Sequence, residues 1–231
     1  MHKQFKFLLL VCFFSLSKPG YADGNLFLTG AEVTSDSATY LYVGTALPLP
    51  GSNLGDGFVL HLWADYQTYS YAAGVIDIDA EIKGLSAALG YHGSGEDNWW
   101  DVRLGVIRSD ISLSPNDPGN DSAGTDTSLK YQMEGEKRLS ADFKMLGNFE
   151  YIFDRSAHWT RARFLSRNDD NTYDGPEIIY QGDDSYSAWQ LGWALTEMPL
   201  SKQWSMGLKA GLRFDENDTA VYAGIELSTP Y

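Results

Sequence analysis

The sequence predicts an all-β fold: an antiparallel up-and-down transmembrane β-barrel of about 12 strands (10–12), preceded by a cleaved signal peptide. Three observations predict this class. Apolar and polar residues alternate with a period of two over most of the chain. Aromatic residues make up 14% of the 231 residues, and 23 residues are glycine. After the N-terminus, no stretch reaches the roughly 18 consecutive apolar residues typical of a membrane-spanning helix.

The composition excludes several classes of partner and cofactor. A formal net charge of -14 argues against a nucleic-acid partner, because phosphate neutralisation needs a basic surface. Cys12 is the only cysteine, so there is no disulfide framework and no cysteine metal site. We therefore expect no cofactor and no metal centre.

Residues 1–22 are typical of a secretory signal peptide. Lys3 and Lys6 precede an apolar run, Phe7–Leu16, and Gly20 and Ala22 place small residues where a signal peptidase cuts. The run is too short for a transmembrane helix, which needs about 20 residues. Cleavage after Ala22 would leave a single β-barrel domain, 23–231, in the envelope. A buried N-terminal helix and a lipoprotein are the alternatives.

The strands follow from the alternation, which is clearest in residues 206–214. There Leu208 and Leu212 share one face, and Lys209 and Arg213 share the other. In chain order we expect strands near 26–34, 38–47, 57–71, 77–91, 100–106, 126–136, 139–153, 157–167, 174–182, 189–195, 206–214 and 221–228. Gly, Pro, Asn and Asp separate them, at 48–56, 92–98, 114–125, 168–174, 183–184 and 215–218.

Alternation alone fits a soluble barrel as well as a membrane barrel, since only the direction of the apolar face differs. The polar face here consists mostly of Gly, Ala and Ser with isolated basic residues, which suits a narrow aqueous lumen. Glycine on an exposed face would pack nothing and cost backbone entropy. The apolar face ends in aromatic residues such as Trp100, Trp189 and Trp204, as an interfacial girdle does. We therefore expect outer-membrane lipid around the barrel.

Charged residues on the predicted inward face form the first candidate site. One interpretation is a charged track that orients a polar or anionic solute, and the other is a structural ion network that fills a narrow barrel. The predicted lumen-lining residues are Arg103, Arg161, Arg163, Lys209, Arg213, Asp65, Glu150 and Glu226.

Aromatic and histidine residues form the remaining candidates. Trp63, Tyr66, Tyr69 and Tyr71 could stack on sugar rings, although a girdle or packing role explains them too. His61 stands about 13 Å from Asp65 along one strand, too far for contact. His92 and His158 fall near predicted strand ends. No serine stands in a G-x-S-x-G setting, so we assign no catalytic residue. The acidic loop 114–126 is best explained as solvated, with calcium binding as the alternative.

Three spaced motifs carry a family resemblance: 56–66 with Tyr69 and Tyr71, 114–120 with Gly124, and 175–177 followed by 185–192. In order and spacing they resemble the BcsS family of cellulose-biosynthesis accessory proteins, over most of the mature chain. His61 departs from the family pattern, which carries arginine there. The resemblance implies an envelope protein associated with bacterial cellulose production, and it brings no catalytic residues with it.

The resulting expectation is a non-enzymatic outer-membrane accessory of cellulose or exopolysaccharide biosynthesis or export in a Gram-negative bacterium. Its partners would be outer-membrane lipid and either the cellulose-synthesis machinery or exopolysaccharide. Three alternatives stay open: a small channel for acidic oligosaccharides, an outer-membrane lipid-modifying enzyme such as an acyl hydrolase or transferase, and a soluble periplasmic binding barrel.

Overall fold

The protein folds into a closed antiparallel barrel of 12 strands, which confirms the predicted fold class. The computed structural model describes residues 24–120, 122–184, 186–215 and 218–229, so the predicted signal peptide lies outside the described residues. The strands are β1 Leu26–Thr34, β2 Thr39–Pro48, β3 Gly57–Ala73, β4 Ile76–Ser94, β5 Asn98–Ser114, β6 Gly124–Arg138, β7 Phe143–Ile152, β8 Ala157–Arg167, β9 Tyr173–Gly182, β10 Ser187–Pro199, β11 Ser205–Asp215 and β12 Thr219–Ser228.

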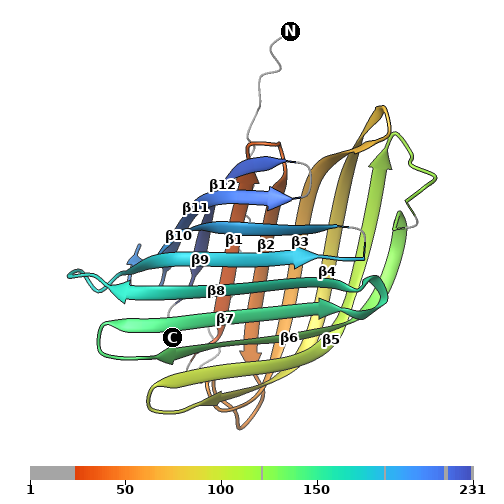
Figure 1. The fold of residues 1–231 in the computed structure, drawn as a ribbon. Helices are drawn as coiled ribbons and strands as arrows, with labels where there is room; N and C mark the ends of the chain where they lie inside the picture. Colours follow the sequence, from red (N-terminus) through yellow and green to blue (C-terminus); the bar gives the residue numbers. More distant parts are fainter. Residues whose placement is uncertain (1–23, 121, 185, 216–217, 230–231) are drawn as a thin grey trace.

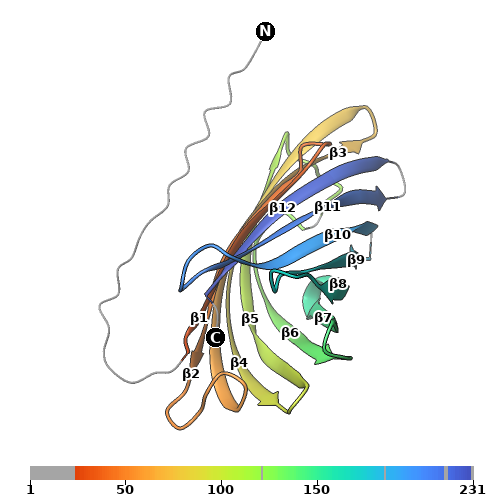
Figure 2. The same cartoon turned by 90° about the vertical axis from the view of Figure 1, so that its left-hand side faces the viewer.

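Each strand pairs with its neighbours in the sequence, and β1 pairs with β12 to close the barrel (Figures 1 and 2). The closing pair runs from Leu28↔Ser228 to Thr34↔Tyr222. Because the strand number is even, β1 begins and β12 ends at the same end of the barrel, which we call the terminal end. A 3-10 turn at Phe153–Arg155 is the one helical element described. No described helix is long and apolar enough to cross a membrane.

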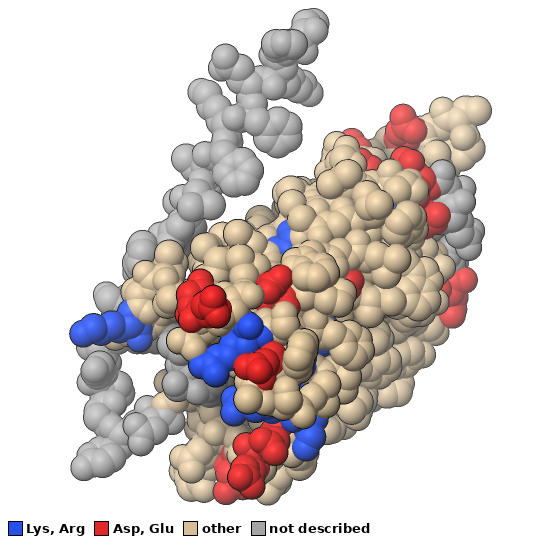
Figure 3. Space-filling model, turned by 60° about the vertical axis from the view of Figure 1, so that its left-hand side comes forward, with Lys and Arg blue, Asp and Glu red and all other residues tan. Residues whose placement is uncertain are grey.

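Apolar side chains face outward around the barrel, and charged side chains face inward. Leu208, Leu212 and Trp193 are 43%, 43% and 56% exposed, whereas Lys130 and Arg163 are buried. Figure 3 shows the consequence, a wall largely free of charge with charged side chains gathered towards the two ends. An apolar wall of this kind contacts acyl chains rather than water. It contradicts the alternative of a soluble periplasmic barrel, whose apolar face would point inward.

Outward-facing aromatic side chains gather near both ends of this wall. At the terminal end Phe27 packs edge-on against Trp204, with ring centroids 5.6 Å apart. At the other end Tyr180 lies 4.5 Å from Trp189. Paired aromatic belts at two levels mark the two membrane–water interfaces of an outer-membrane barrel.

Strands β3, β4 and β5 are longer than the rest and project beyond them at the end opposite the termini (upper right in Figure 1). The 19 residues of β4 extend about 63 Å at 3.3 Å each. Tilted by about 40°, they span roughly 48 Å, against an apolar band of about 25 Å. We call this end the projecting end.

The polarity of β4 inverts where the strand leaves the apolar band. From Leu85 to Tyr91 the outward residues are apolar and exposed. From Asp77 to Lys83 the outward residues are charged, and the inward residues Ile78 and Ala80 are buried. Because apolar residues point inward only where water lies outside, the projecting part of this strand is built like a water-soluble sheet. The predicted arrangement, with apolar side chains outward and polar side chains inward, therefore holds within the apolar band and fails beyond it.

Small residues line the inner face because large side chains from neighbouring strands lie flat over them. A Cβ on Gly44 would stand 2.1 Å from the Trp63 ring, which stacks on Tyr42 with centroids 4.7 Å apart. An aromatic ring that covers a glycine in the neighbouring strand stabilises a sheet at a point where the backbone would otherwise be bare.

Candidate functional site

The inner face carries a network of ion pairs that crosses the lumen. Arg161 and Arg163 extend from β8, and both reach Glu226 on β12. Arg161 Nη1 lies 2.7 Å from Glu226 Oε1, and Arg163 Nη1 lies 2.9 Å from Glu226 Oε2. Around the wall, β8 and β12 are four strands apart, about 19 Å at the usual strand spacing. These contacts therefore cross the barrel instead of running along its wall.

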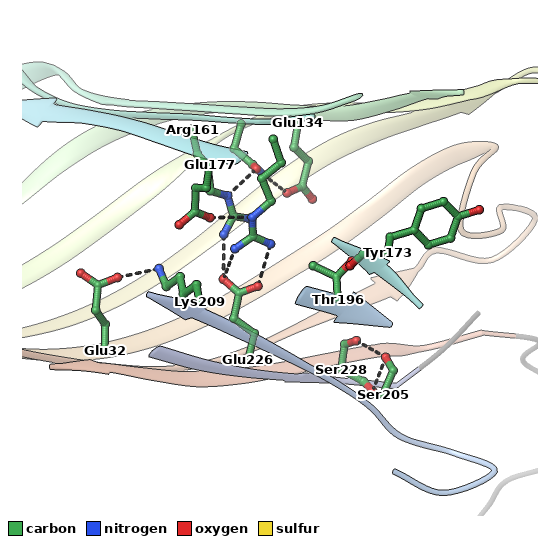
Figure 4. Close-up of polar contacts among 12 residues, drawn as sticks. Glu32, Glu134, Arg161, Tyr173, Glu177, Thr196, Ser205, Lys209, Glu226 and Ser228 are labelled. Atoms are coloured by element: carbon green, nitrogen blue, oxygen red, sulfur yellow. Dashed lines mark hydrogen bonds and ion pairs between the residues drawn. The ribbon is translucent and has the colours of Figure 1, made fainter. Parts of the chain in front are cut away.

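Further contacts cross the same region. Arg163 Nε donates to Glu177 on the neighbouring strand, and the buried Tyr222 hydroxyl of β12 donates to the same carboxylate at 3.1 Å. Lys209 pairs with Glu32 at 2.5 Å. Figure 4 shows Arg161 and Glu177 extending from one wall and Glu226, Lys209 and Glu32 from the wall opposite.

The network continues along the wall towards the terminal end. Arg161 Nε donates to Asn148, whose amide donates to Glu134 at 2.8 Å. Glu134 in turn pairs with Arg103 Nη2 at 2.6 Å. A continuous chain of polar contacts thus joins β5, β6, β7, β8 and β12, and its charges are satisfied within the barrel. This arrangement favours a structural ion network over an open charged track.

The other predicted lumen residues occupy the same inner face. Arg213 pairs with Asp36 near the projecting end. Glu150 pairs with Lys130 at 2.9 Å and accepts a hydrogen bond from Gln132. The carboxylate of Asp65 lies over Gly84, where a Cβ would stand 2.5 Å from it.

The structure divides the predicted aromatic set between two faces. Trp63, Tyr69 and Tyr71 lie at odd positions of β3, on the inner face with the buried His61. Tyr66 lies on the outer face, and its hydroxyl donates to Glu81 at 2.8 Å. The period of two forbids a shared surface for all four rings, so one sugar chain could not stack on the whole set.

Glu81, which accepts the hydrogen bond from Tyr66, also lines a polar groove on the outer face of the projecting sheet. A cavity of about 440 Å³ is lined mainly by hydroxyls and carboxylates. Within it the Ser70 hydroxyl donates to Asp79 at 2.7 Å. Its lining consists of the outward-facing Thr68, Ser70, Asp79, Glu81, Ser112 and Ser114, of Ser37 in the β1–β2 turn, and of Tyr69, Ala80 and Leu113, whose side chains point to the inner face. We call this surface the tip groove. The sequence analysis did not predict it, because it depends on the polarity inversion of β3, β4 and β5.

A second cavity, of about 660 Å³, lies at the terminal end beside the β8–β9 loop. In this loop the Thr172 hydroxyl and backbone N–H both donate to Asp170 Oδ1. These hydrogen bonds favour the ionised carboxylate and lower the pKa of Asp170 below its ordinary value.

The histidines lie in two different environments. His61 and His92 are buried on the inner face, beside Asp101. His92 lies near a strand end, as predicted, since β4 ends at Ser94. His158 faces outward, 4.9 Å from the Tyr180 ring, and its Nε2 has no hydrogen-bond partner among the described residues. A lipid-modifying enzyme would need a histidine paired with serine or carboxylate at the lipid boundary. The described histidines provide no such pair there.

An apolar outer wall, aromatic belts and a charged, self-paired interior define a transmembrane β-barrel of the outer-membrane type. Within that class, the chain belongs to the family described as "Cellulose biosynthesis protein BcsS", whose model matches residues 26–231. The predicted family is thereby confirmed. No curated protein matches the chain.

Solved outer-membrane barrels share the fold. The KdgM porin is 11% identical with a TM-score of 0.51, and covers 89% of this chain and 99% of its own. The same porin "in complex with disordered oligogalacturonate" gives a TM-score of 0.52 at 11% identity and the same coverage. The β domain of the Bordetella autotransporter Brka is 14% identical, with a TM-score of 0.48, over 90% of this chain and 99% of that one. At 11% identity the two porin structures show the fold alone.

Proposed function

We propose that this protein is a non-enzymatic accessory of cellulose biosynthesis, exported by its signal peptide and held in the outer membrane of a Gram-negative bacterium. Family membership supports the process, and the apolar wall with its aromatic belts supports the membrane location. Its partners by chemistry are neutral glucan chains and the proteins that make them. The barrel acts as an anchor that presents a binding surface beyond the membrane.

One observation carries the choice of an anchor over an export pore. The pairs that Arg161 and Arg163 make with Glu226 connect opposite walls of the barrel. A glucan chain passing through would have to separate these partly buried charges, which costs up to several kcal/mol for each ion left unpaired in the interior. Cellulose carries no charge with which to replace either partner. The network therefore supports a lumen that stays closed to glucan.

Single-channel recording in planar bilayers tests this. We expect wild-type protein to be silent and Glu226→Ala, which removes the shared carboxylate, to show channel openings. Glu197→Ala is the matched control, since Glu197 pairs with Lys144 near the terminal end and is half exposed. In a cellulose-producing host, deletion of the gene should lower cellulose yield, and both variants should restore it. A conducting wild type, or yield that depends on an open lumen, would contradict the anchor.

We place the glucan contact in the tip groove. Sugar hydroxyls hydrogen-bond well to Asp, Glu and Ser side chains, and the Tyr66 ring, hydrogen-bonded to Glu81 of the groove, offers a face for stacking. The groove lies on the part of β3, β4 and β5 whose outer face is polar, and so faces water. Neutral glucan suits it, since recognition there would depend on hydrogen bonds and stacking.

Binding of cello-oligosaccharides to the purified barrel tests the groove. Tyr66→Ala and Glu81→Gln should each weaken binding, whereas Asp77→Asn, on the same face of β4 but outside the groove, should not. Trp63→Phe, which changes a ring inside the lumen, serves as a second control. If Trp63→Phe weakens binding and Tyr66→Ala leaves it unchanged, the contact lies in the lumen instead.

A second candidate function is a channel for acidic oligosaccharides. The observation that favours it is the Arg161 and Arg163 pair, which a uronate carboxylate could engage in place of Glu226. The KdgM porin was solved in complex with oligogalacturonate, and it shares this fold. This function predicts that oligogalacturonate blocks conductance through Glu226→Ala and that replacing both arginines with Ala removes the block.

A further inference from the structure

Three polar side chains from three neighbouring strands meet in a buried cluster near the terminal end. His61 lies on β3, His92 on β4 and Asp101 on β5. They are 8%, 3% and 0% exposed. His92 is directly opposite Asp101, and Gly90 is directly opposite Arg103. His61 is opposite Ala88, so its side chain reaches the other two diagonally, past Gly90.

The facing atoms are the imidazole Nε2 atoms and the carboxylate oxygens. The two Nε2 atoms are 3.3 Å apart, His61 Nε2 is 3.5 Å from Asp101 Oδ2, and His92 Nε2 is 3.4 Å from Asp101 Oδ1. A tetrahedral zinc site with bonds of about 2.0–2.1 Å has ligand atoms separated by roughly 3.3–3.4 Å. The two imidazoles approach different oxygens of Asp101, and one ligand atom from each of the three residues lies within 4.8 Å of the other two. Small side-chain rotations would bring these three atoms to the edges of such a tetrahedron.

Two further observations point to a ligand. Asp101 has no exposure, and its oxygens contact Arg103 Nε at 2.9 Å and the two imidazoles, but none of these contacts with the described residues has good hydrogen-bond geometry, which is rare for a fully buried carboxylate. The space between the groups exists because position 90 is glycine. A Cβ on Gly90 would stand 2.7 Å from Asp101 Oδ1 and 3.0 Å from His61 Nε2.

We propose that His61, His92 and Asp101 form a binding site for a transition-metal dication such as Zn²⁺. Two imidazole nitrogens and a carboxylate are a donor set that zinc prefers over magnesium or calcium. The burial of all three ligands indicates a structural site that ties β3, β4 and β5 together, and it goes beyond the proposed glucan role.

Arg103 competes with the metal ion. Its Nη1 lies 2.9 Å from His61 Nδ1, and its Nε lies 2.9 Å from Asp101 Oδ2. When a metal binds His61 Nε2, the ring proton moves to Nδ1, which then no longer accepts a hydrogen bond from the guanidinium. Arg103 keeps its contact with Glu134, 2.6 Å away, so the guanidinium has a partner after it leaves the imidazole.

Titration of the detergent-solubilised full barrel with Zn²⁺ by calorimetry, and with Co²⁺ by visible absorption, tests the site. We expect one ion per chain and tetrahedral Co²⁺ bands. His92→Ala and Asp101→Asn should weaken binding at least about tenfold, as should Gly90→Ala, which fills the space. His158→Ala, the matched control, should bind as wild type does. Arg103→Gln should bind more tightly, an outcome that a purely structural hydrogen-bond cluster would not give.

The wild-type titration is decisive even if a ligand variant does not assemble. Folded wild-type barrel, identified by its faster migration before boiling, that takes up neither ion overturns the proposal. Uptake that persists unchanged in His92→Ala overturns it as well.

Discussion

Arg163 on β8 holds Glu226 on β12 through two hydrogen bonds, Nη1 to Oε2 at 2.9 Å and Nη2 to Oε1 at 3.0 Å. This bidentate pair fixes the separation of two walls that are far apart around the barrel. Arg163 is buried, so its charge has no solvent to replace a lost partner.

Glu226→Gln should therefore destabilise the barrel. Breaking a buried pair by removing one partner costs about 3–5 kcal/mol, and the remaining Glu177 contact keeps the loss towards the lower value. The measurement is the temperature at which the fast-migrating folded band disappears on an unboiled gel. Glu197→Gln should change this temperature little. An equal decrease in unfolding temperature in the two variants would contradict a particular stabilising role for the pair that crosses the lumen.

Because the polarity of β4 inverts along its length, its outer face should tolerate an introduced charge in the projecting part but not in the apolar band. Leu89→Arg places a guanidinium in the apolar band and should cost about 2–4 kcal/mol. Asp77→Arg, on the same face of the projecting part, should cost about 0–1 kcal/mol. Unfolding by urea in lipid bilayers measures both. Similar costs at the two positions would mean that the band extends along the whole strand.

The packing of Trp63 over Gly44 predicts a steric effect that a second mutation relieves. Gly44→Ala pushes a Cβ into the indole ring, and overpacking of this kind costs about 1–3 kcal/mol. Gly147→Ala, on a strand where nothing lies within 4 Å of the added atom, is the control and should fold normally. Adding Trp63→Ala should cancel most of the specific loss from Gly44→Ala. Absence of that coupling in the double-mutant cycle would contradict the packing.

The orientation of the barrel predicts which end is reached from outside the cell. An exported chain enters the outer membrane from the periplasm, so we expect the terminal end there and the projecting end outside. An epitope inserted in the Gly74–Val75 turn should bind antibody on intact cells. The same epitope in the 139–142 loop, at the terminal end, should bind only after the outer membrane is permeabilised. The reverse labelling pattern would invert the assignment.

The β8–β9 loop predicts a local dependence on pH. Because the pKa of Asp170 is lowered, its hydrogen bonds to Thr172 are fully present above the ordinary aspartate pKa of about 3.9. They are lost only as pH falls through the lower folded value. The Thr172 amide resonance in an NMR titration should report this, and Asp170→Asn should remove the transition. A midpoint at or above about 4 would contradict it.

The sequence could predict the barrel because its physical cause is local. In a strand that separates lipid from a crowded lumen, apolar and polar residues must alternate at every position. The faces on which Leu208 and Lys209 lie can therefore be predicted without knowing which strands are adjacent. The 157–167 strand has the predicted bounds. The projecting end of β4 was predicted to within one residue, but that of β5 was missed, because the predicted strand near 100–106 stops where the apolar residues change from the outward face to the inward Ile107 and Ile111 while the period stays the same.

The contacts across the lumen could not be predicted, because they depend on register and closure. Nothing in the chain connects Arg161 with Glu226, 65 residues later, until β1 pairs with β12. The same holds for His61 and His92, whose facing nitrogens depend on the alignment of β3, β4 and β5. One local sign of the cluster is Gly90, which belongs to a row of small inward residues. Small residues at these positions leave space for larger side chains from the neighbouring strands.

The charged outer face between Asp77 and Lys83 also limits the depth at which the barrel inserts in the membrane. Sinking by a few ångströms would press carboxylates against acyl chains, and rising would lift leucines into water, so both displacements are opposed. A collar of this sort holds the exposed tip at a constant height above the lipid headgroups, independent of any partner that docks there.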